Sequence, residues 1–173
     1  MNPNLPKQPE EIIESAYECY NEGATIVHIH GRDKTGENTS NPEVLKKIRE
    51  GIREKCNLII QYSTGGGPDL TQEQRIECLE ATPEMASLNM GSLMRISGNY
   101  ASIAWSNMPN EIEMYVSRMM ELGVKPEMEV YNLAMFPMWR KSILDATSEG
   151  SFESSPNSCI KTSIWHYLQV FRT

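Results

Sequence analysis

Short apolar segments alternate with amphipathic segments of helical period along this chain, and this alternation limits the fold more than any other feature of the sequence. The segments with strand character are Ala24–His30, Asn57–Tyr62, Glu84–Asn89 and Pro126–Asn132. Strands that alternate with helices pair in parallel through right-handed crossovers. The sequence therefore predicts an α/β protein with about four parallel strands.

Helix-capping residues mark the ends of the segments between these strands. Gly23 follows the predicted helix Glu10–Glu22 at the position where a left-handed residue ends a helix. Asn41 is a typical N-cap for the second helix, and Thr71 with Gln74 forms a capping box at the start of the third. The remaining predictions are a third helix that continues through Glu80, further helices over Asn110–Leu122 and Phe136–Ala146, and an irregular loop over 92–108.

Two of the three histidines of the chain stand at alternate positions at the end of the first predicted strand. Because side chains alternate between the two faces of a strand, His28 and His30 point to the same side. Two imidazoles placed in this way can bind one divalent metal such as zinc, which takes imidazole nitrogen at about 2.0–2.1 Å. Two hydrogen-bonded histidines at a sheet end are the alternative, and the spacing leaves both interpretations open.

Polar side chains also end or follow the other predicted strands. They are Ser63 and Thr64, Ser87 and Asn89, and Glu127 and Glu129. The carboxyl ends of parallel strands meet at one edge of a sheet, where α/β proteins place their chemistry. Because no Gly-x-Gly-x-x-Gly follows the first strand, the pattern favours a barrel-type active site over a nucleotide-binding fold.

Each of these polar groups has a functional and a structural interpretation. The segment Ser63–Gly67 offers hydroxyls and backbone N–H groups to an anion, or it is a flexible turn. Ser87 and Asn89 either bind a substrate or are buried polar groups with protein partners. A carboxylate at Glu127 or Glu129 needs a cation, a metal-bound donor or a raised pKa, unless it belongs to a salt bridge on the strand.

Composition excludes several other classes of protein. The chain has 16 Lys and Arg against 23 Asp and Glu, a net charge of −7, and no basic stripe, so we expect no nucleic-acid partner. No apolar run approaches the length of a membrane-spanning helix, and the N-terminal residues do not have the pattern of a signal peptide. The four cysteines are Cys19, Cys56, Cys78 and Cys159. Their wide spacing is typical of reduced thiols, which predicts a cytoplasmic protein.

Taken together, the strand segments and the residues that follow them resemble the β-keto acid cleavage enzyme family. The resemblance extends from about Asn4 to Tyr131 and rests on four blocks in order: Gly23–Asp33, Ile59–Gly67, Pro83–Gly91 and Lys125–Tyr131. It implies a zinc-dependent (β/α)8 TIM barrel, with zinc as the cofactor. It also implies that a β-keto acid, such as the 3-keto-5-aminohexanoate of lysine fermentation, condenses with acetyl-CoA to give acetoacetate and a new CoA thioester.

The resemblance assigns roles to residues at matching positions. It implies that zinc binds to His28 and His30. It implies that the carboxylate and keto groups of the substrate bind at Ser63, Gly66 and Ser87, where the family often has Thr in place of Ser87. It implies that Glu129 is the catalytic acidic residue of its strand. Family members are homo-oligomers of closed barrels, so a second copy of the chain is an expected partner.

The family pattern is incomplete at both ends of the chain. A family barrel has a strand with an acidic substrate-binding residue ahead of the segment that corresponds to Pro3–Pro6, and its later strands carry a third zinc ligand, an Arg and an Asp. We find no such pattern after about Asp145. We therefore expect a partial barrel over residues 1–146, a divergent tail over 147–173, and impaired activity. An inactive fragment or pseudo-enzyme with a partial metal site is the alternative, with His166 as a candidate third ligand.

Overall fold

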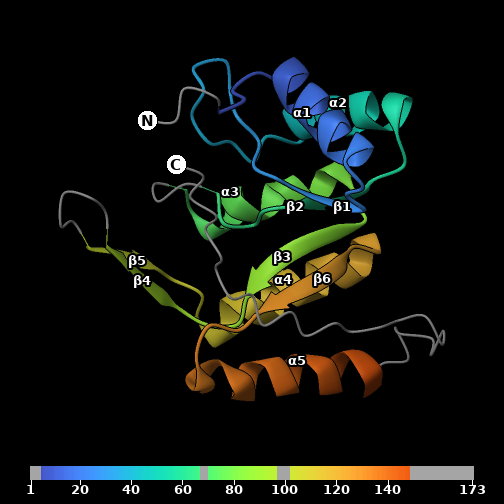
Figure 1. Cartoon of the computed structure of the whole chain (residues 1–173). Helices are drawn as coiled ribbons and strands as arrows, with labels where there is room; N and C mark the ends of the chain where they lie inside the picture. Colours follow the sequence, from blue (N-terminus) through green and yellow to red (C-terminus); the bar gives the residue numbers. More distant parts are fainter. Residues whose placement is uncertain (1–4, 67–69, 97–101, 149–173) are drawn as a thin grey trace.

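Four parallel strands form the central sheet of the protein, in the order β1-β2-β3-β6, with helices between them (Figure 1). A computed structural model describes residues 5–66, 70–96 and 102–148. The strands of the sheet are β1 (Ile26–Ile29), β2 (Ile59–Tyr62), β3 (Met85–Asn89) and β6 (Lys125–Glu129). The helices are α1 (Pro9–Asn21), α2 (Pro42–Lys55), α3 (Gln72–Ile76), α4 (Pro109–Leu122) and α5 (Phe136–Ser148), with 3-10 turns η1 (Glu77–Ala81) and η2 (Leu133–Met135). This confirms the predicted α/β class, and the arrangement is that of an arc of a TIM barrel.

The predicted helix caps are present in the structure. Gly23 follows α1 with a φ of +95°, a backbone conformation that favours glycine. The Asn41 side chain accepts a hydrogen bond from the Glu43 N–H at 2.9 Å, and Thr71 and Gln74 cap α3 reciprocally. The third helix differs from the prediction, because its α-helical part ends at Ile76 and the chain continues to Ala81 as the 3-10 turn η1.

The helices cover one face of the sheet and bury its apolar side chains there. The buried strand residues on this face are Ile29, Ile60, Tyr62, Ala86 and Leu88. Their fully buried partners on the helices include Ile48, Ile52, Leu79, Ile112, Tyr115 and Met119. Since each buried Leu, Ile or Met side chain contributes about 1.5–3 kcal/mol, this interface is the main source of stability and holds the strands in fixed register.

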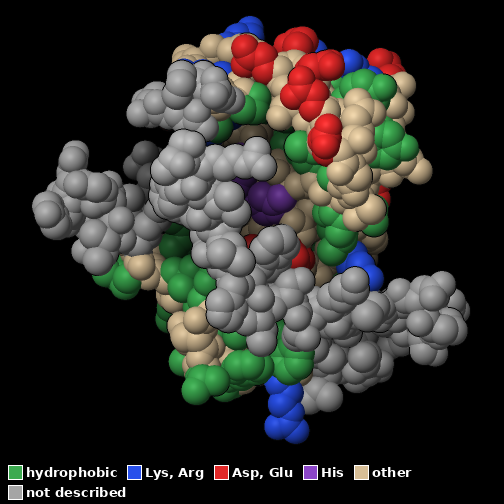
Figure 2. Space-filling view, in the orientation of Figure 1, with side chains coloured by type: hydrophobic (Ala, Val, Ile, Leu, Met, Phe, Trp, Pro, Cys, Tyr) green, Lys and Arg blue, Asp and Glu red, His purple; other side chains and the backbone are tan. Residues whose placement is uncertain are grey.

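The opposite face of the sheet carries the polar residues. The strand register pairs His28 with Gln61 and Ser87 with Glu127, and paired residues of parallel strands point to the same side. At the amino ends of the strands this face holds Ile26, which is 47% exposed. Among the described residues no helix covers this face, and Figure 2 shows histidine side chains at the floor of a hollow on it.

An antiparallel hairpin follows β3, where the sequence predicted an irregular loop over 92–108. That prediction was wrong: β4 (Leu93–Ile96) pairs with β5 (Ser102–Trp105) and projects from the carboxyl edge of the sheet (Figure 1). The prediction gave weight to the Gly and Asn residues of this segment. It overlooked Ile103 and Trp105, whose residue types are enriched in strands.

The C-terminal part of the described chain is α5, which reaches Ser148. The predicted boundary between residues 146 and 147 therefore falls inside a helix, and most of the predicted tail, with His166, lies outside the described residues. Over the ranges that the structure describes, no helix is long and apolar enough to cross a membrane.

Candidate metal and substrate site

The two histidines predicted to bind a metal lie side by side at the carboxyl end of β1. His28 is in the strand and His30 directly follows it, and their ring centroids are 5.0 Å apart with an interplanar angle of 62°. Both side chains are exposed on the open face of the sheet. Because zinc binds imidazole nitrogen at about 2.0–2.1 Å, one ion fits between two rings at this separation. The donor set and its position therefore fit a zinc ion.

A polar chain of side chains supports His28 from the neighbouring strands. Nδ1 of His28 lies 2.6 Å from Oε1 of Gln61, and Nε2 of Gln61 donates to Oε2 of Glu127 at 2.5 Å. Gln61 is only 4% exposed, so its amide is satisfied by these two partners rather than by bulk water. The alternative of hydrogen-bonded histidines is thus partly present, since one ring nitrogen of His28 is engaged and the other ring nitrogen remains for a ligand.

The environment of His30 keeps its imidazole neutral. Desolvation lowers the pKa of His30 to about 4, and the nearby His28 and Arg32 act in the same direction. A neutral imidazole has a free electron pair, which is the form that binds a metal.

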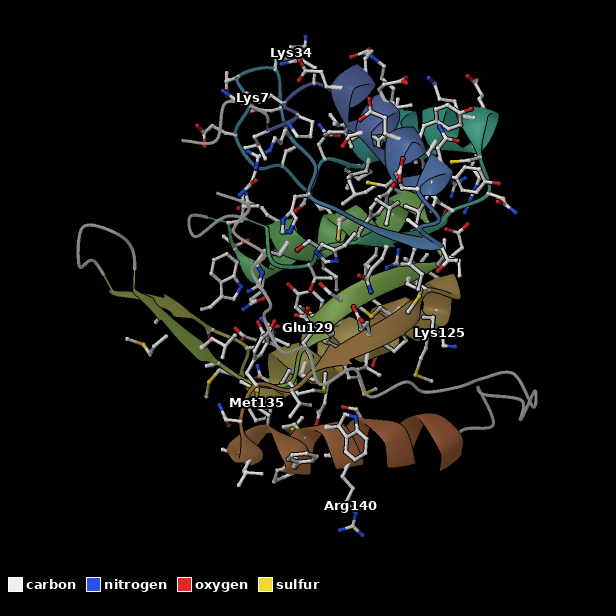
Figure 3. The ribbon with its side chains drawn as sticks, viewed as in Figure 1. Lys7, Lys34, Lys125, Glu129, Met135 and Arg140 are labelled. Carbon is white, nitrogen blue, oxygen red and sulfur yellow. The ribbon has the colours of Figure 1, made fainter. Side chains whose placement is uncertain are left out.

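Glu129 ends β6 at the carboxyl edge of the sheet, opposite Lys125 at the other end of the strand (Figure 3). Burial and, after it, the charge of Glu127 raise the pKa of Glu129 to about 7, against a hydrogen bond with Tyr131 that lowers it. Among the described residues Glu129 forms no ion pair with a basic side chain. Of the two interpretations of this carboxylate, a raised pKa or a salt bridge on the strand, the structure therefore favours the raised pKa for Glu129.

The turn after β2 depends on a glycine at position 66. Gly66 has a φ of +58°, and a Cβ on this residue would lie 2.8 Å from Cδ1 of Leu70 and 3.1 Å from Cγ of Arg75. Ser63 Oγ accepts a hydrogen bond from the Gly65 N–H at 3.2 Å. The described part of this turn is thus shaped by its own contacts, whereas Gly67 lies outside the described residues.

Ser87 lies in the middle of the polar face and is 4% exposed. Its carbonyl oxygen accepts a hydrogen bond from Thr64 Oγ1 at 2.6 Å, which joins the end of β2 to β3. On the same face, Oδ1 of Asn89 is buried and has no hydrogen-bond partner among the described residues. Ser87 lies beside Glu127 in the strand register, which agrees with the prediction that the polar residues of these strands meet at one edge of the sheet.

The sequence analysis missed Arg75, a buried residue that connects the turn after β2 to the segment after β5 through hydrogen bonds. Its guanidinium donates to Thr64 O at 2.9 Å, Ser106 O at 3.1 Å and Asn107 Oδ1 at 2.9 Å. It also lies 5.6 Å from the centroid of the Trp105 ring. A signal was present in the sequence, since Arg75 stands four residues before a core leucine and so faces the apolar side of its helix.

The described residues place two potential metal ligands, His28 and His30, at this edge and no third one. Within the ranges 5–66, 70–96 and 102–148 there is no group of three His, Cys, Asp or Glu side chains placed to hold a metal ion. The fold and the site thus define an α/β chain with a two-histidine pair and a row of polar groups at the carboxyl edge of a parallel sheet.

Comparison with known proteins gives this arrangement a family. The model of the beta-keto acid cleavage enzyme family matches residues 1–154, and the chain belongs to this family. The match continues past Asp145, the residue at which the sequence pattern suggested that the similarity ends.

Three curated relatives share between a third and two fifths of their aligned residues with this chain. It is 39% identical over 135 residues to a 3-keto-5-aminohexanoate cleavage enzyme of Fusobacterium nucleatum, covering 78% of this chain and 48% of the relative. It is 38% identical over 138 residues to the enzyme of that name from Acetoanaerobium sticklandii, covering 79% and 49%. A 3-oxoadipate:acetyl-CoA acetyltransferase of Cupriavidus necator is 33% identical over 135 residues, covering 78% and 45%. The chain spans about half the length of the curated relatives that it matches.

Proposed function

We propose that this chain contributes the first half of the active site of a zinc-dependent β-keto acid cleavage enzyme. The reaction is the condensation of a β-keto acid, such as 3-keto-5-aminohexanoate, with acetyl-CoA to give acetoacetate and a new CoA thioester. The observation that carries this proposal is the pair of His28 and His30 rings, 5.0 Å apart on the polar face of the sheet. Relatives named as cleavage enzymes and acetyl-CoA acetyltransferases support the reaction class.

The residues at the carboxyl edge have separate tasks in this proposal. His28 and His30 would hold the zinc ion, which when bound polarises the keto oxygen of the substrate. The turn Ser63–Gly66 and Ser87 orient the substrate through its carboxylate and keto groups, which lowers the entropic part of the barrier. Glu129, with a pKa near 7, accepts or returns a proton at its carboxyl oxygen near neutral pH.

A second candidate function is a chain that retains a partial metal site and has no activity of its own. It is favoured by one observation: the described part of the chain contains no group of three potential ligands. Homo-oligomerisation and a cytoplasmic location stay predictions under either candidate.

Turnover with defined substrates distinguishes the two candidates. The purified full chain, loaded with zinc, is incubated with acetyl-CoA and either 3-keto-5-aminohexanoate or 3-oxoadipate, and acetoacetate is measured. Acetoacetate formation that is lost in the His28→Ala, His30→Ala double variant would support the enzyme. Zinc binding without turnover would support the partial metal site. A chain that neither binds zinc nor turns over either substrate would contradict both.

A further inference from the structure

A series of two hydrogen bonds connects side chains of β1, β2 and β6 across the polar face of the sheet. Gln61 lies between His28 and Glu127, with its Oε1 toward the ring and its Nε2 toward the carboxylate. The amide is nearly fully buried in the middle strand of the three. A buried amide with one partner at each end has a single favourable orientation, which its partners determine.

The donors and acceptors in this series can be assigned in order, starting from Glu127. Nε2 of Gln61 lies 2.5 Å from Oε2 of Glu127, and this carboxyl oxygen accepts the hydrogen bond. The NH2 group of an amide only donates hydrogen bonds, so it is this group of Gln61 that faces Glu127. The carbonyl oxygen of the amide then faces His28, and because this oxygen also only accepts, Nδ1 of His28 must carry the proton.

The tautomer of His28 follows from this sequence of donors and acceptors. A neutral imidazole with its proton on Nδ1 has an unprotonated Nε2, and this nitrogen is free to bind a metal. In metalloproteins the ring N–H opposite the metal commonly donates to a carboxylate or carbonyl oxygen, and loss of that partner costs about 10–100-fold in metal affinity.

We propose that Gln61 and Glu127 are positioning residues that fix His28 as the Nδ1–H tautomer and so present its Nε2 to the metal. This inference rests on the proposed zinc site at His28 and His30. It gives a reason for a buried glutamine in an otherwise apolar strand, a position for which neither packing nor the family roles stated above account.

The first test reads the tautomer directly, in metal-free protein. The full chain is labelled with ¹⁵N-histidine and long-range ¹H–¹⁵N spectra are recorded at a pH near 8. The wild type should show His28 protonated on Nδ1. Gln61→Met removes both hydrogen bonds and should release His28 into a mixture of tautomers. The ring of His30 serves as an internal control that should not change.

A second variant keeps the test valid if Gln61→Met unfolds the protein, which circular dichroism would reveal. Glu127→Gln preserves the shape of the side chain but can face Gln61 with either oxygen or nitrogen, so the amide loses its fixed orientation. We expect mixed His28 tautomers in this variant as well. Glu121→Gln, an equal change of charge on the exposed surface of α4, is the matched control and should leave His28 unchanged.

Zinc affinity is the second readout, measured by competition with a chromogenic chelator. Gln61→Met should weaken zinc binding about 10–100-fold, Glu127→Gln should weaken it less, and Glu121→Gln should not weaken it. A wild-type His28 protonated on Nε2, or folded Gln61→Met protein with unchanged tautomer and affinity, would overturn the inference. If the wild type binds no zinc but holds His28 as the Nδ1–H tautomer, the zinc proposal fails. The positioning of His28 by Gln61 and Glu127 is then still supported.

Discussion

Glu129 gives the protein a specific dependence of stability on pH. Its pKa is raised from 4.5 to about 7 by burial and by the charge of Glu127. In the unfolded chain the group loses its proton near pH 4.5, so between about pH 4.5 and 7 the native state binds the additional proton. Stability therefore falls as the pH rises through this window.

The size of the effect follows from the shift. A shift of about 2.5 pKa units corresponds to roughly 3 kcal/mol, an upper value because Glu129 is only partly buried. About 2 kcal/mol of this should be lost between pH 5 and pH 8. Glu129→Gln keeps the shape of the side chain without the charge, so this variant should match the wild type near pH 4 and exceed its stability at pH 8 by about 2–3 kcal/mol.

Urea unfolding at a series of pH values, followed by circular dichroism in the presence of a chelator, measures this difference. His30 acts in the opposite direction, because its pKa is lowered and stability that depends on its neutral form is lost as the pH falls below 6.5. The difference between the variant and the wild type removes this contribution, and Glu121→Gln serves as the exposed control. A free-energy difference between Glu129→Gln and the wild type that stays constant from pH 5 to pH 8 would refute the reasoning.

Two further substitutions test the turn after β2 and its support. Gly66→Ala should destabilise by about 2–4 kcal/mol in urea titrations, because strain at positive φ adds to contacts of the new methyl group with Leu70 and Arg75. Gly123→Ala, at φ +68° with nothing within 4 Å of its Cβ, should cost only about 1–2 kcal/mol, and equal losses in the two variants would contradict the role of the contacts. Arg75→Met removes three hydrogen bonds, of whose acceptors Ser106 O keeps its bond from Gln72 Nε2, and should cost about 3 kcal/mol, a fall of roughly 6–12 °C in Tm. An unchanged Tm for this variant would mean that the buried guanidinium does not organise the edge.

The order of the parallel elements could be predicted from the sequence because local signals mark it. Capping residues such as Asn41 and Thr71 fix where helices begin, and the apolar segments between helices are the strands. The predicted bounds of the strands were less accurate than their order. The first predicted strand, Ala24–His30, is longer than β1, because the ladder extends only as far as β2 offers partners, from Ile59 to Tyr62.

The placement of the two histidines could also be predicted, since alternation within one strand is a local property. The role of Gln61 could not, because it depends on which residues of two separate strands lie opposite each other. The same limit applies to Arg75, whose partners belong to the turn after β2 and to the end of the hairpin that the sequence analysis missed. The register between strands is set by the packing of the whole sheet against its helices, so it cannot be predicted from the sequence of any single segment.

The central claim is that His28 and His30 form a metal site, and zinc stoichiometry tests it most directly. Purified full chain is stripped with a chelator, reloaded with limiting zinc and analysed for bound metal. The His28→Ala, His30→Ala double variant is compared with a Cys19→Ala control, which removes an exposed potential ligand elsewhere. We predict one bound zinc in the wild type and the control, and none in the double variant. Zinc binding that is absent from the wild type, or unaffected by loss of the two histidines, would contradict the account.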